Sequence, residues 1–487
     1  MPARNGQQFL DGLRDGREIW LGGERVADVT AHPALANGAQ SIARLYDLQH
    51  DPEWSGQLTG PSPSSGEPVG LSYLTPRSSE DLVLRRRMME IWASATCGMM
   101  GRTPDYVNVI LMACAAAHDF FEQNHAGHGE NMVRYYEYCR EHDLCLTHTL
   151  VNPQVNRAVG PSGQAEPFLA LGIVEKTSAG MLVRGARMLA TLAPFSDEII
   201  VFPSTIVSAG QDEWRYAFAF ALPIATPGLR FICRESFDLG RGHFDHPLGS
   251  RFEEMDAMAI FEDVLVPWDR VFLCGDVQRC NQLFKETGAL YHMINQVGAK
   301  NVVKSEFFLG VATLMAEGIG ADGFLHVQEK LCELVDDLEI VRGLLRAGEA
   351  DAVPGPGGAW HPAPEPLHTL RNFFPKVYPR MAEILHQIGA GGLMAIPTEA
   401  DLHGPNADAI AKYYQGRNLA ADDRIRLFRL AWDMSASAFA GRQVLYERFF
   451  FGDPVRITAS RYQGYDKDPA RAAVRRFLAD GVALPAG

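Results

Sequence analysis

The stretch Tyr216-Ala217-Phe218-Ala219-Phe220-Ala221-Leu222-Pro223 decides the fold class, because it is a short apolar run that ends at a turn residue. Two more runs of this kind are Ile199-Ile200-Val201-Phe202-Pro203 and Ala259-Ile260-Phe261-Glu262-Asp263-Val264-Leu265-Val266-Pro267. Runs of this length, rich in β-branched and aromatic residues, are typical of strands. We therefore predict a β region over residues 144–272.

The sequence on both sides of this region favours helices. Residues 79–142 include Val107-Asn108-Val109-Ile110-Leu111-Met112-Ala113-Cys114-Ala115-Ala116-Ala117, which is rich in Ala, Leu and Met and free of Gly and Pro. Helical periodicity returns over 284–348 and 367–393, and the last expected helix runs from Asp422 to Phe450. The pattern predicts an α+β protein with an N-terminal helical domain (1–143), a middle β domain (144–272) and a C-terminal helical bundle (273–487).

Bulk composition excludes several classes of function. The chain has 487 residues and a net charge of -14, from 59 acidic and 45 basic residues, which argues against binding nucleic acid or an anionic membrane. Its eight cysteines form no CxxC pair, so reduced thiols in a cytosol fit best. No segment has the apolar length of a signal peptide or a membrane span. We expect a cytoplasmic protein.

Two segments bring together residues suited to phenol chemistry. The first is Gly101-Arg102-Thr103-Pro104-Asp105-Tyr106, and the second is Leu146-Thr147-His148-Thr149-Leu150-Val151-Asn152-Pro153-Gln154-Val155-Asn156-Arg157. A guanidinium, a tyrosyl hydroxyl and an imidazole can surround a phenolic oxygen, stabilise its anion and exchange its proton. Each residue type is also common in purely structural positions.

These segments resemble those of the oxygenase component of 4-hydroxyphenylacetate 3-monooxygenase, a family of reduced-flavin-dependent phenol hydroxylases. The resemblance extends to Val26-Ala27-Asp28-Val29-Thr30-Ala31-His32-Pro33 and to the run from Lys176 to Thr191. It also includes Tyr446-Glu447-Arg448-Phe449-Phe450-Phe451-Gly452-Asp453-Pro454-Val455-Arg456. The resemblance implies an acyl-CoA dehydrogenase-like fold, with a β-barrel or β-sandwich as its middle domain. It also implies that the C-terminal bundle (273–487) serves oligomerisation.

The resemblance also implies a substrate site. Arg102 would supply fixed positive charge, Tyr106 a hydrogen bond, and His148 the proton acceptor that draws the phenol toward phenolate. An imidazole with a pKa near ~6.5 suits that task at neutral pH. Ser204 and Thr205 occupy the place where the family holds the distal end of its substrate, although Ser-Thr after Pro is also an ordinary turn.

For the flavin, the resemblance implies a loop, a hydroxyl and a C-terminal segment. Thr191 matches a hydroxyl that would act as a donor near flavin N5 and protect the reactive flavin. The other implied FAD contacts are His148, Gln154, Val155, Asn156, Arg157, Phe450, Phe451, Gly452 and Asp453. Relatives often carry Asp at position 156, so Asn156 removes one negative charge near the pyrophosphate.

The implied activity is FADH2-dependent hydroxylation of a phenol. FADH2 would react with O2 to give the C4a-hydroperoxide, whose distal oxygen the phenolate attacks at its ortho carbon, giving a catechol. The best candidate substrate is 4-hydroxyphenylacetate, and a halophenol, a nitrophenol, tyrosine or a carrier-tethered tyrosyl group would need the same chemistry. The sequence lacks Gly-x-Gly-x-x-Gly after a strand and a Walker loop. We therefore expect a separate NAD(P)H-dependent flavin reductase, and by resemblance a homotetramer.

Three other classes of protein share parts of this pattern. A 4-hydroxybutyryl-CoA dehydratase needs cysteines for a [4Fe-4S] cluster, but Cys97 stands alone with Gly101 four residues on, and Met293 to Lys300 contains no cysteine. An acyl-CoA dehydrogenase would need a carboxylate base, for which Glu447 beside Arg448 is the nominee. A non-enzymatic scaffold would not bind reduced flavin. The histidines form no H-E-x-x-H pattern, so we expect no metal site.

Overall fold

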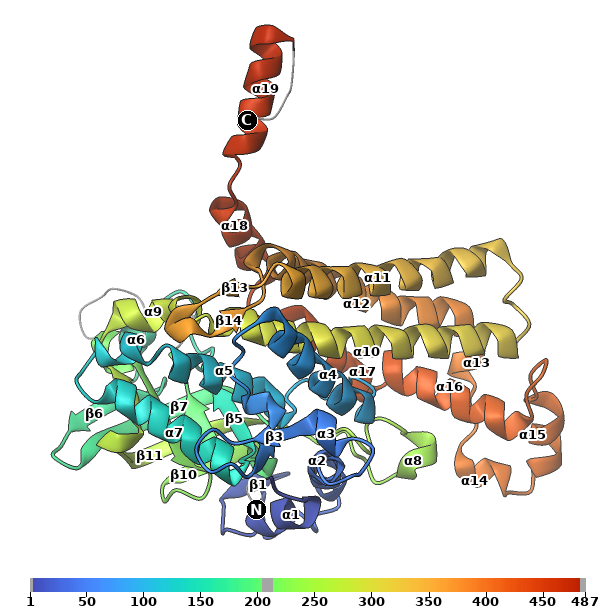
Figure 1. Cartoon of the computed structure of the whole chain (residues 1–487). Helices are drawn as coiled ribbons and strands as arrows, with labels where there is room; N and C mark the ends of the chain where they lie inside the picture. Colours follow the sequence, from blue (N-terminus) through green and yellow to red (C-terminus); the bar gives the residue numbers. More distant parts are fainter. Residues whose placement is uncertain (1–2, 204–212, 482–487) are drawn as a thin grey trace.

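A computed structural model describes residues 3–203 and 213–481 of the chain. Helices, a β region and a helical bundle follow one another along the chain (Figure 1). The N-terminal part contains α1 (Gly6–Gly12), β1 (Ile19–Leu21), β2 (Glu24–Val26), α2 (Ala36–Leu48), α3 (Ser55–Leu58), β3 (Thr59–Pro61), β4 (Pro68–Gly70), α4 (Ser79–Ala95), α5 (Pro104–Ala116), α6 (His118–Glu122) and α7 (His128–His142).

The middle part is built from two sheets. Its elements are β5 (Leu146–Thr149), β6 (Gly172–Lys176), β7 (Gly180–Thr191), β8 (Glu198–Val201), β9 (Phe218–Pro223), β10 (Leu229–Cys233), α8 (Gly242–Asp245), β11 (Asp256–Pro267) and β12 (Val271–Cys274). One sheet has the order β2-β1-β10-β11-β7-β6 and the other β12-β9-β8-β5, and neither closes into a barrel within the described residues. The predicted α+β class is confirmed, with a sandwich as its middle part.

Strands β1 and β2 were not predicted from the sequence. They come from the mainly helical N-terminal part, and β1 pairs in parallel with β10 of the larger sheet. Each has only three residues, which is too short for an apolar alternation to stand out. The N-terminal segment therefore shares a core with the β region.

The C-terminal part is dominated by three long helices that run side by side, α10, α11 and α12 (Figure 1). Its elements are α9 (Val277–Glu286), α10 (Ala289–Gly318), α11 (Leu325–Ala350), β13 (Val353–Pro354), β14 (Trp360–His361), α12 (Pro364–Gly389), α13 (Gly391–Met394), α14 (Glu399–Leu402), α15 (Ala407–Tyr413), α16 (Ala421–Ser435), α17 (Ala438–Phe449), α18 (Pro454–Gly464) and α19 (Asp468–Asp480).

The prediction of one last helix from Asp422 to Phe450 is wrong. Ser437 is extended (φ -76°, ψ 172°) and its hydroxyl accepts a hydrogen bond from Ala440 N, so it caps a new helix, α17. Helices α18 and α19 follow, which the sequence analysis did not predict. They form a C-terminal arm in which α18 contacts α12 and α19 projects beyond it (Figure 1).

Side chains that alternate along β8, a strand of the smaller sheet, point into two different hydrophobic cores. Ile199 and Val201 of β8 face the core shared with the larger sheet, whereas Ile200 and Phe202 face a second core beneath α5 and α7. His148 of β5 pairs in parallel with Ile200, so its ring lies on the helix side of this sheet.

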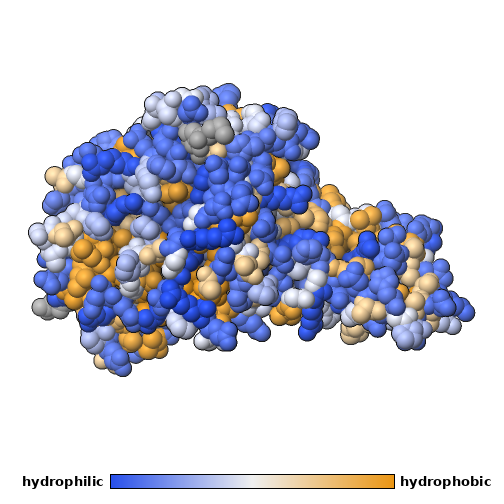
Figure 2. All heavy atoms as spheres, turned by 90° about the horizontal axis from the view of Figure 1, so that it is seen from below, coloured by the Kyte–Doolittle hydropathy of each residue, from blue (hydrophilic) through white to orange (hydrophobic). Residues whose placement is uncertain are grey.

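Seen from below, the surface is mostly hydrophilic, with separate apolar patches between the polar side chains (Figure 2). Among the described residues, no helix has the length and apolarity needed to cross a membrane.

Candidate active site

Strand β5 and the start of α5 bring Arg102, Tyr106 and His148 together. The ring centroids of Tyr106 and His148 are 5.5 Å apart, and the Arg102 guanidinium carbon lies 3.9 Å from the Tyr106 ring centroid. All three residues are buried. The spatial cluster predicted from two distant motifs therefore exists in the fold.

Local structure explains these positions. Pro104 occupies the first turn of α5, and the buried Asp105 accepts a hydrogen bond from Gln296 of α10 at 3.0 Å, which anchors the helix start. Strand β5 is tied to β7, because Thr147 and Thr149 donate hydroxyl hydrogen bonds to the carbonyls of that strand. The imidazole of His148 thus projects from a doubly anchored strand.

Electrostatics give the three groups different tasks. Burial, and then the charge of Arg102, holds the pKa of His148 well below its usual range, so the imidazole is neutral at pH 7. Burial raises the pKa of Tyr106, which keeps its phenol protonated. The unperturbed pKa assumed for His148 from sequence is thus wrong, but the consequence favours proton acceptance: the site contains a fixed cation, a hydroxyl donor and a neutral base.

Aromatic rings from other elements enclose this cluster. The Phe450 ring lies 6.5 Å from that of Tyr106 and 4.9 Å from the Arg102 guanidinium carbon. The Phe202 ring lies 6.1 Å from that of His148. The predicted C-terminal segment therefore reaches the predicted phenol site.

Arg371 of α12 is a site residue that the sequence analysis missed. Its Nη2 donates to the Phe451 carbonyl at 3.1 Å, and its charge acts on Tyr106. Burial lowers the pKa of Arg371 to about 10. A single arginine within a helical pattern carries no local signal of this role.

The loop after β5 surrounds a cavity of about 250 Å³. Asn152, Gln154, Asn156 and Arg157 contribute to its lining. Val155 is 63% exposed and points away from the core. The amide and guanidinium donors around this cavity suit a ligand rich in carbonyl and phosphate oxygens.

The predicted C-terminal flavin segment approaches this loop. Arg157 contributes to lowering the pKa of Asp453, after the hydrogen bonds that Asp453 accepts from the backbone of Arg456 and Val455. Those hydrogen bonds cap α18, so the carboxylate of Asp453 also has a structural role. Gly452 has a φ of 104°, a conformation that glycine adopts without strain.

Arg187 supplies a further test of whether a flavin fits here. Its side chain is fully buried, and Nη1 donates to the Leu150 carbonyl and to the Asn152 side chain. Nε and Nη2 are buried without a partner among the described residues. Burial lowers the pKa of Arg187 to about 10, and unpaired buried donors are costly. Orphan donors beside this loop fit an acceptor-rich cofactor such as FAD.

Thr191 is arranged differently from the donor expected. Its hydroxyl donates to Asp256 Oδ1 at 2.7 Å. Although burial opposes it, the pairing with Arg442 and Arg234 holds the pKa of Asp256 well below its usual range. Because the hydroxyl proton is committed to a carboxylate, the Thr191 oxygen can take part in a further hydrogen bond only as an acceptor.

Ser204 and Thr205 lie outside the described residues.

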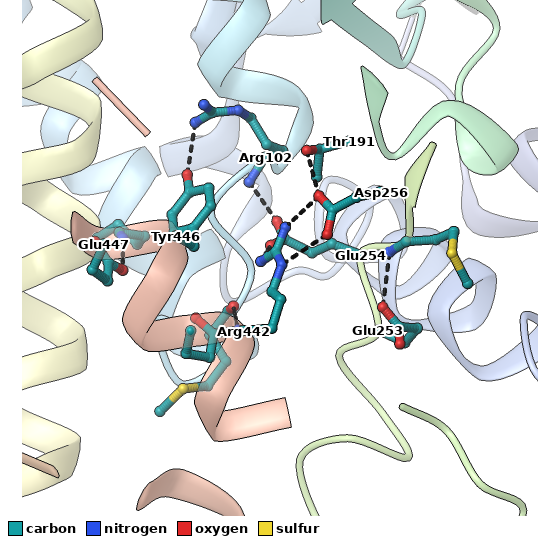
Figure 3. Close-up of polar contacts among 12 residues, drawn as sticks. Arg102, Thr191, Glu253, Glu254, Asp256, Arg442, Tyr446 and Glu447 are labelled. Carbon is teal, nitrogen blue, oxygen red and sulfur yellow. Dashed lines mark hydrogen bonds and ion pairs between the residues drawn. The ribbon is translucent and has the colours of Figure 1, made fainter. Parts of the chain in front are cut away.

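An ionic network behind the site was also missed by sequence analysis. Arg442 of α17 forms ion pairs with both Glu254 and Asp256. Glu254 accepts a hydrogen bond from the backbone N–H of Arg102 at 2.6 Å (Figure 3). Tyr446, one turn after Arg442, accepts a hydrogen bond from Arg102. These residues are far apart in sequence and form no motif, so only the fold reveals the network.

Comparisons with known proteins identify the family. The profile described as 4-hydroxyphenylacetate 3-hydroxylase N terminal matches residues 5–273, and the profile for its C terminal matches residues 280–479. The chain belongs to the 4-hydroxyphenylacetate 3-hydroxylase family.

The relatives align with this hydroxylase family member over nearly its whole length. It is 48% identical over 481 residues to the 4-hydroxyphenylacetate 3-monooxygenase oxygenase component of Thermus thermophilus, covering 99% of this chain and 98% of the relative. It is 46% identical to the same component from Geobacillus sp., covering 100% of this chain and 99% of that one. A 4-nitrophenol 2-monooxygenase oxygenase component from Rhodococcus sp. is 34% identical, covering 96% and 90%.

Solved structures agree in fold. The crystal structure of a 4-hydroxyphenylacetate 3-monooxygenase oxygenase component complexed with FAD and 4-hydroxyphenylacetate matches with a TM-score of 0.94 and 48% identity, covering 98% of this chain and 99% of that one. An archaeal 4-hydroxybutyryl-CoA dehydratase from N. maritimus matches with a TM-score of 0.88 at 21% identity, covering 99% and 97%, which shows a shared fold alone. In the described part of this hydroxylase family member, no three His, Cys, Asp or Glu residues gather as a metal site.

Proposed function

We propose that the protein is the oxygenase component of a two-component monooxygenase that hydroxylates 4-hydroxyphenylacetate ortho to its hydroxyl group, with FADH2 and O2. The observation that carries the proposal is the buried cluster of Arg102, Tyr106 and His148. The 48% identical structure complexed with FAD and 4-hydroxyphenylacetate supports the choice of cofactor and substrate.

Arg102, Tyr106 and His148 activate the phenol by favouring its anion. Arg102 lies directly before the N-terminus of α5, so the guanidinium and the helix dipole both attract negative charge. Tyr106 donates a hydrogen bond to the phenolic oxygen, and the neutral His148 accepts the proton. A phenolate beside His148 stabilises the resulting imidazolium and offsets the burial and the Arg102 charge that disfavour it.

Bound FADH2 supplies, with O2, the electrophilic oxygen that the electron-rich ortho carbon of a phenolate requires. We assign FAD contacts to His148, Gln154, Val155, Asn156, Arg157, Thr191 and the segment Phe450–Asp453. Thr191, whose proton is held by Asp256, accepts a hydrogen bond from a flavin N–H. Arg187 holds the loop through Leu150 and Asn152. Ser204 and Thr205 bind the distal end of the substrate.

Electrons come from a separate NAD(P)H-dependent flavin reductase that delivers FADH2. The sequence lacks the glycine-rich phosphate loops of nucleotide-binding domains, which supports a reductase on another chain. Reduced flavin needs a reducing compartment, and all eight cysteines are free thiols. These points support a cytoplasmic location.

The protein assembles as a homotetramer through its C-terminal arm, α18 and α19. Helix α19 projects beyond the body (Figure 1), and apolar side chains of the arm are strongly exposed: Val455 to 79%, Phe477 to 57% and Leu478 to 78%. A second copy of the chain is the partner that a projecting apolar helix fits. Light scattering of Phe477→Ser/Leu478→Ser should give a smaller species than the wild type, whereas an unchanged mass would refute this assembly.

The activity is tested by combining the purified protein with FAD, NADH and an unrelated flavin reductase. With 4-hydroxyphenylacetate we expect consumption of NADH to yield 3,4-dihydroxyphenylacetate. With 4-nitrophenol, the substrate named for the 34% identical relative, we expect mainly H2O2. Formation of H2O2 alone with 4-hydroxyphenylacetate would contradict the substrate, and hydroxylation of 4-nitrophenol in its place would identify the alternative.

A further inference from the structure

The guanidinium of Arg102 is fixed by a hydroxyl from the opposite end of the chain. Arg102 Nη1 donates to the Tyr446 hydroxyl oxygen at 2.6 Å, across 344 residues of sequence. The guanidinium also stacks on the Tyr106 ring and lies 4.9 Å from the centre of the Phe450 ring. In the part of the chain that is described, no side chain other than that of Tyr446 hydrogen-bonds this guanidinium, which leaves Nε and Nη2 for a ligand.

Tyr446 is itself held in place. Arg442 lies one turn earlier in α17, with its guanidinium carbon 4.8 Å from the centre of the Tyr446 ring. Arg442 bonds Glu254, and Glu254 accepts the backbone N–H of Arg102. The backbone and the side chain of Arg102 are thus both tied to the same helix, one through Glu254 and Arg442 and the other through Tyr446 (Figure 3).

A buried charge cluster also lies beside the Tyr446 ring. Lys300 Nζ is 5.3 Å from the ring centre, and both Lys300 and Lys304 bond the carboxylate of Glu447. All three side chains are fully buried or nearly so. Because Glu447 is the residue after Tyr446, this ion cluster fixes α17 at the turn that carries the hydroxyl.

Gly101 shows that the approach of Tyr446 is close. A Cβ atom on Gly101 would overlap the hydroxyl and ring atoms of Tyr446. Any larger residue at position 101 would therefore displace the ring or the backbone beside Arg102. The glycine of the Gly101-Arg102 motif is explained by Tyr446, a contact that the sequence does not reveal.

The chemistry of the Tyr446 hydroxyl suits a positioning role. Burial raises its pKa well above the usual range, against the opposing effect of Arg102, so it stays a neutral phenol. A carboxylate in its place would neutralise Arg102, whereas a neutral oxygen orients the guanidinium and leaves its charge available. Tyr446 accepts from Arg102 without competing for the ligand.

We propose that Tyr446 is a positioning residue that holds the Arg102 guanidinium against the phenolic oxygen of the substrate, with Gly101 providing the space for its hydroxyl. The inference deepens the proposed function and rests on it. It adds to the substrate site a residue of the C-terminal bundle, more than three hundred residues from the motif that it serves.

The test uses the full-length protein and 4-nitrophenol as a spectroscopic probe, because its phenolate absorbs visible light. Recording the absorbance of the protein–probe complex over a series of pH values, from acid to base, gives the pKa of the bound phenol. In Tyr446→Phe, which keeps the ring and removes the hydroxyl, we expect this pKa to rise by about one unit and binding to weaken roughly tenfold, the loss of one charge-assisted hydrogen bond. Tyr413→Phe, on an exposed tyrosine, is the matched control and should match the wild type.

Gly101→Ala provides a second, independent variant. If the hydroxyl position is what matters, Gly101→Ala should also raise the pKa of the bound phenol, and the double variant with Tyr446→Phe should show much less than the sum of the two effects. Circular dichroism confirms that each variant is folded before the titration.

The outcomes separate the two proposals. A wild-type protein that neither binds nor ionises any phenol, including 4-hydroxyphenylacetate, contradicts the proposed function and the positioning role with it. Wild-type ionisation that is unchanged in Tyr446→Phe contradicts the positioning role alone. If Tyr446→Phe raises KM and lowers kcat while the pKa of the bound phenol is unchanged, Tyr446 has only a structural role, and this result also overturns the inference.

Discussion

Replacement of Arg102 by Met removes the only fixed charge that we assign to the phenolic oxygen while keeping the length of the side chain. A unit charge at ~4 Å in an effective dielectric of ~20 stabilises a phenolate by about 4 kcal/mol, or about three pKa units. A phenol with a pKa near ~10 would thus ionise near ~7 beside Arg102. At pH 7.5 the phenolate fraction should fall roughly 200-fold in the variant.

The assay measures catechol and H2O2 per FADH2 consumed, at pH 7.5 and at pH 9. Arg102→Met should release mainly H2O2 at pH 7.5 and regain catechol formation as the pH rises, because solvent hydroxide then ionises the phenol. Arg417→Met removes an exposed arginine and should behave as the wild type. Efficient hydroxylation by Arg102→Met at pH 7.5, or no recovery at pH 9, would refute the electrostatic argument.

Three further predictions concern stability, pH and coupling. Arg442→Met leaves the buried carboxylate of Glu254 without its ion-pair partner. The free energy of unfolding, measured in urea, should therefore fall by about 3–5 kcal/mol. A loss below ~1 kcal/mol would show that the ionic network does not stabilise the fold. Native His148 resists protonation, whereas the histidine of the unfolded chain binds a proton below pH ~6.5. When the pH is lowered to 5.5, the free energy of unfolding should therefore fall by about 1.4 kcal/mol more in the wild type than in His148→Asn. Equal dependence of this free energy on pH in the two proteins would contradict the lowered pKa. Thr191→Val removes one hydrogen-bond acceptor from the flavin site, so the share of oxygen released as H2O2 should rise about threefold to tenfold, and unchanged coupling would exclude that contact.

Motifs that are contiguous in sequence were sufficient to predict the helix and the strand that border the site. The helical run 107–117 and the apolar run 199–203 carry local signals, so the sequence predicts both the helix that carries Tyr106 and the strand that pairs with His148. The pKa of His148 could not be predicted, because its lowering depends on burial and on the approach of Arg102 in three dimensions.

The support behind the site escaped sequence analysis for the same reason. Asp256 determines the direction of the Thr191 hydrogen bond, yet it comes from the neighbouring strand β11. Arg442 and Tyr446 lie in a helix whose start is set by the Ser437 cap inside an otherwise helical pattern. Long-range pairing of this kind leaves no periodicity, so it becomes visible only when the chain is folded.

The most direct test of the central claim is a single turnover of the purified protein with chemically reduced FAD, 4-hydroxyphenylacetate and ¹⁸O2, followed by mass spectrometry of the product. Our account predicts 3,4-dihydroxyphenylacetate that carries one ¹⁸O atom, at the new hydroxyl ortho to the original one. Unchanged 4-hydroxyphenylacetate with H2O2 as the only product of O2, or a catechol without ¹⁸O, would contradict it.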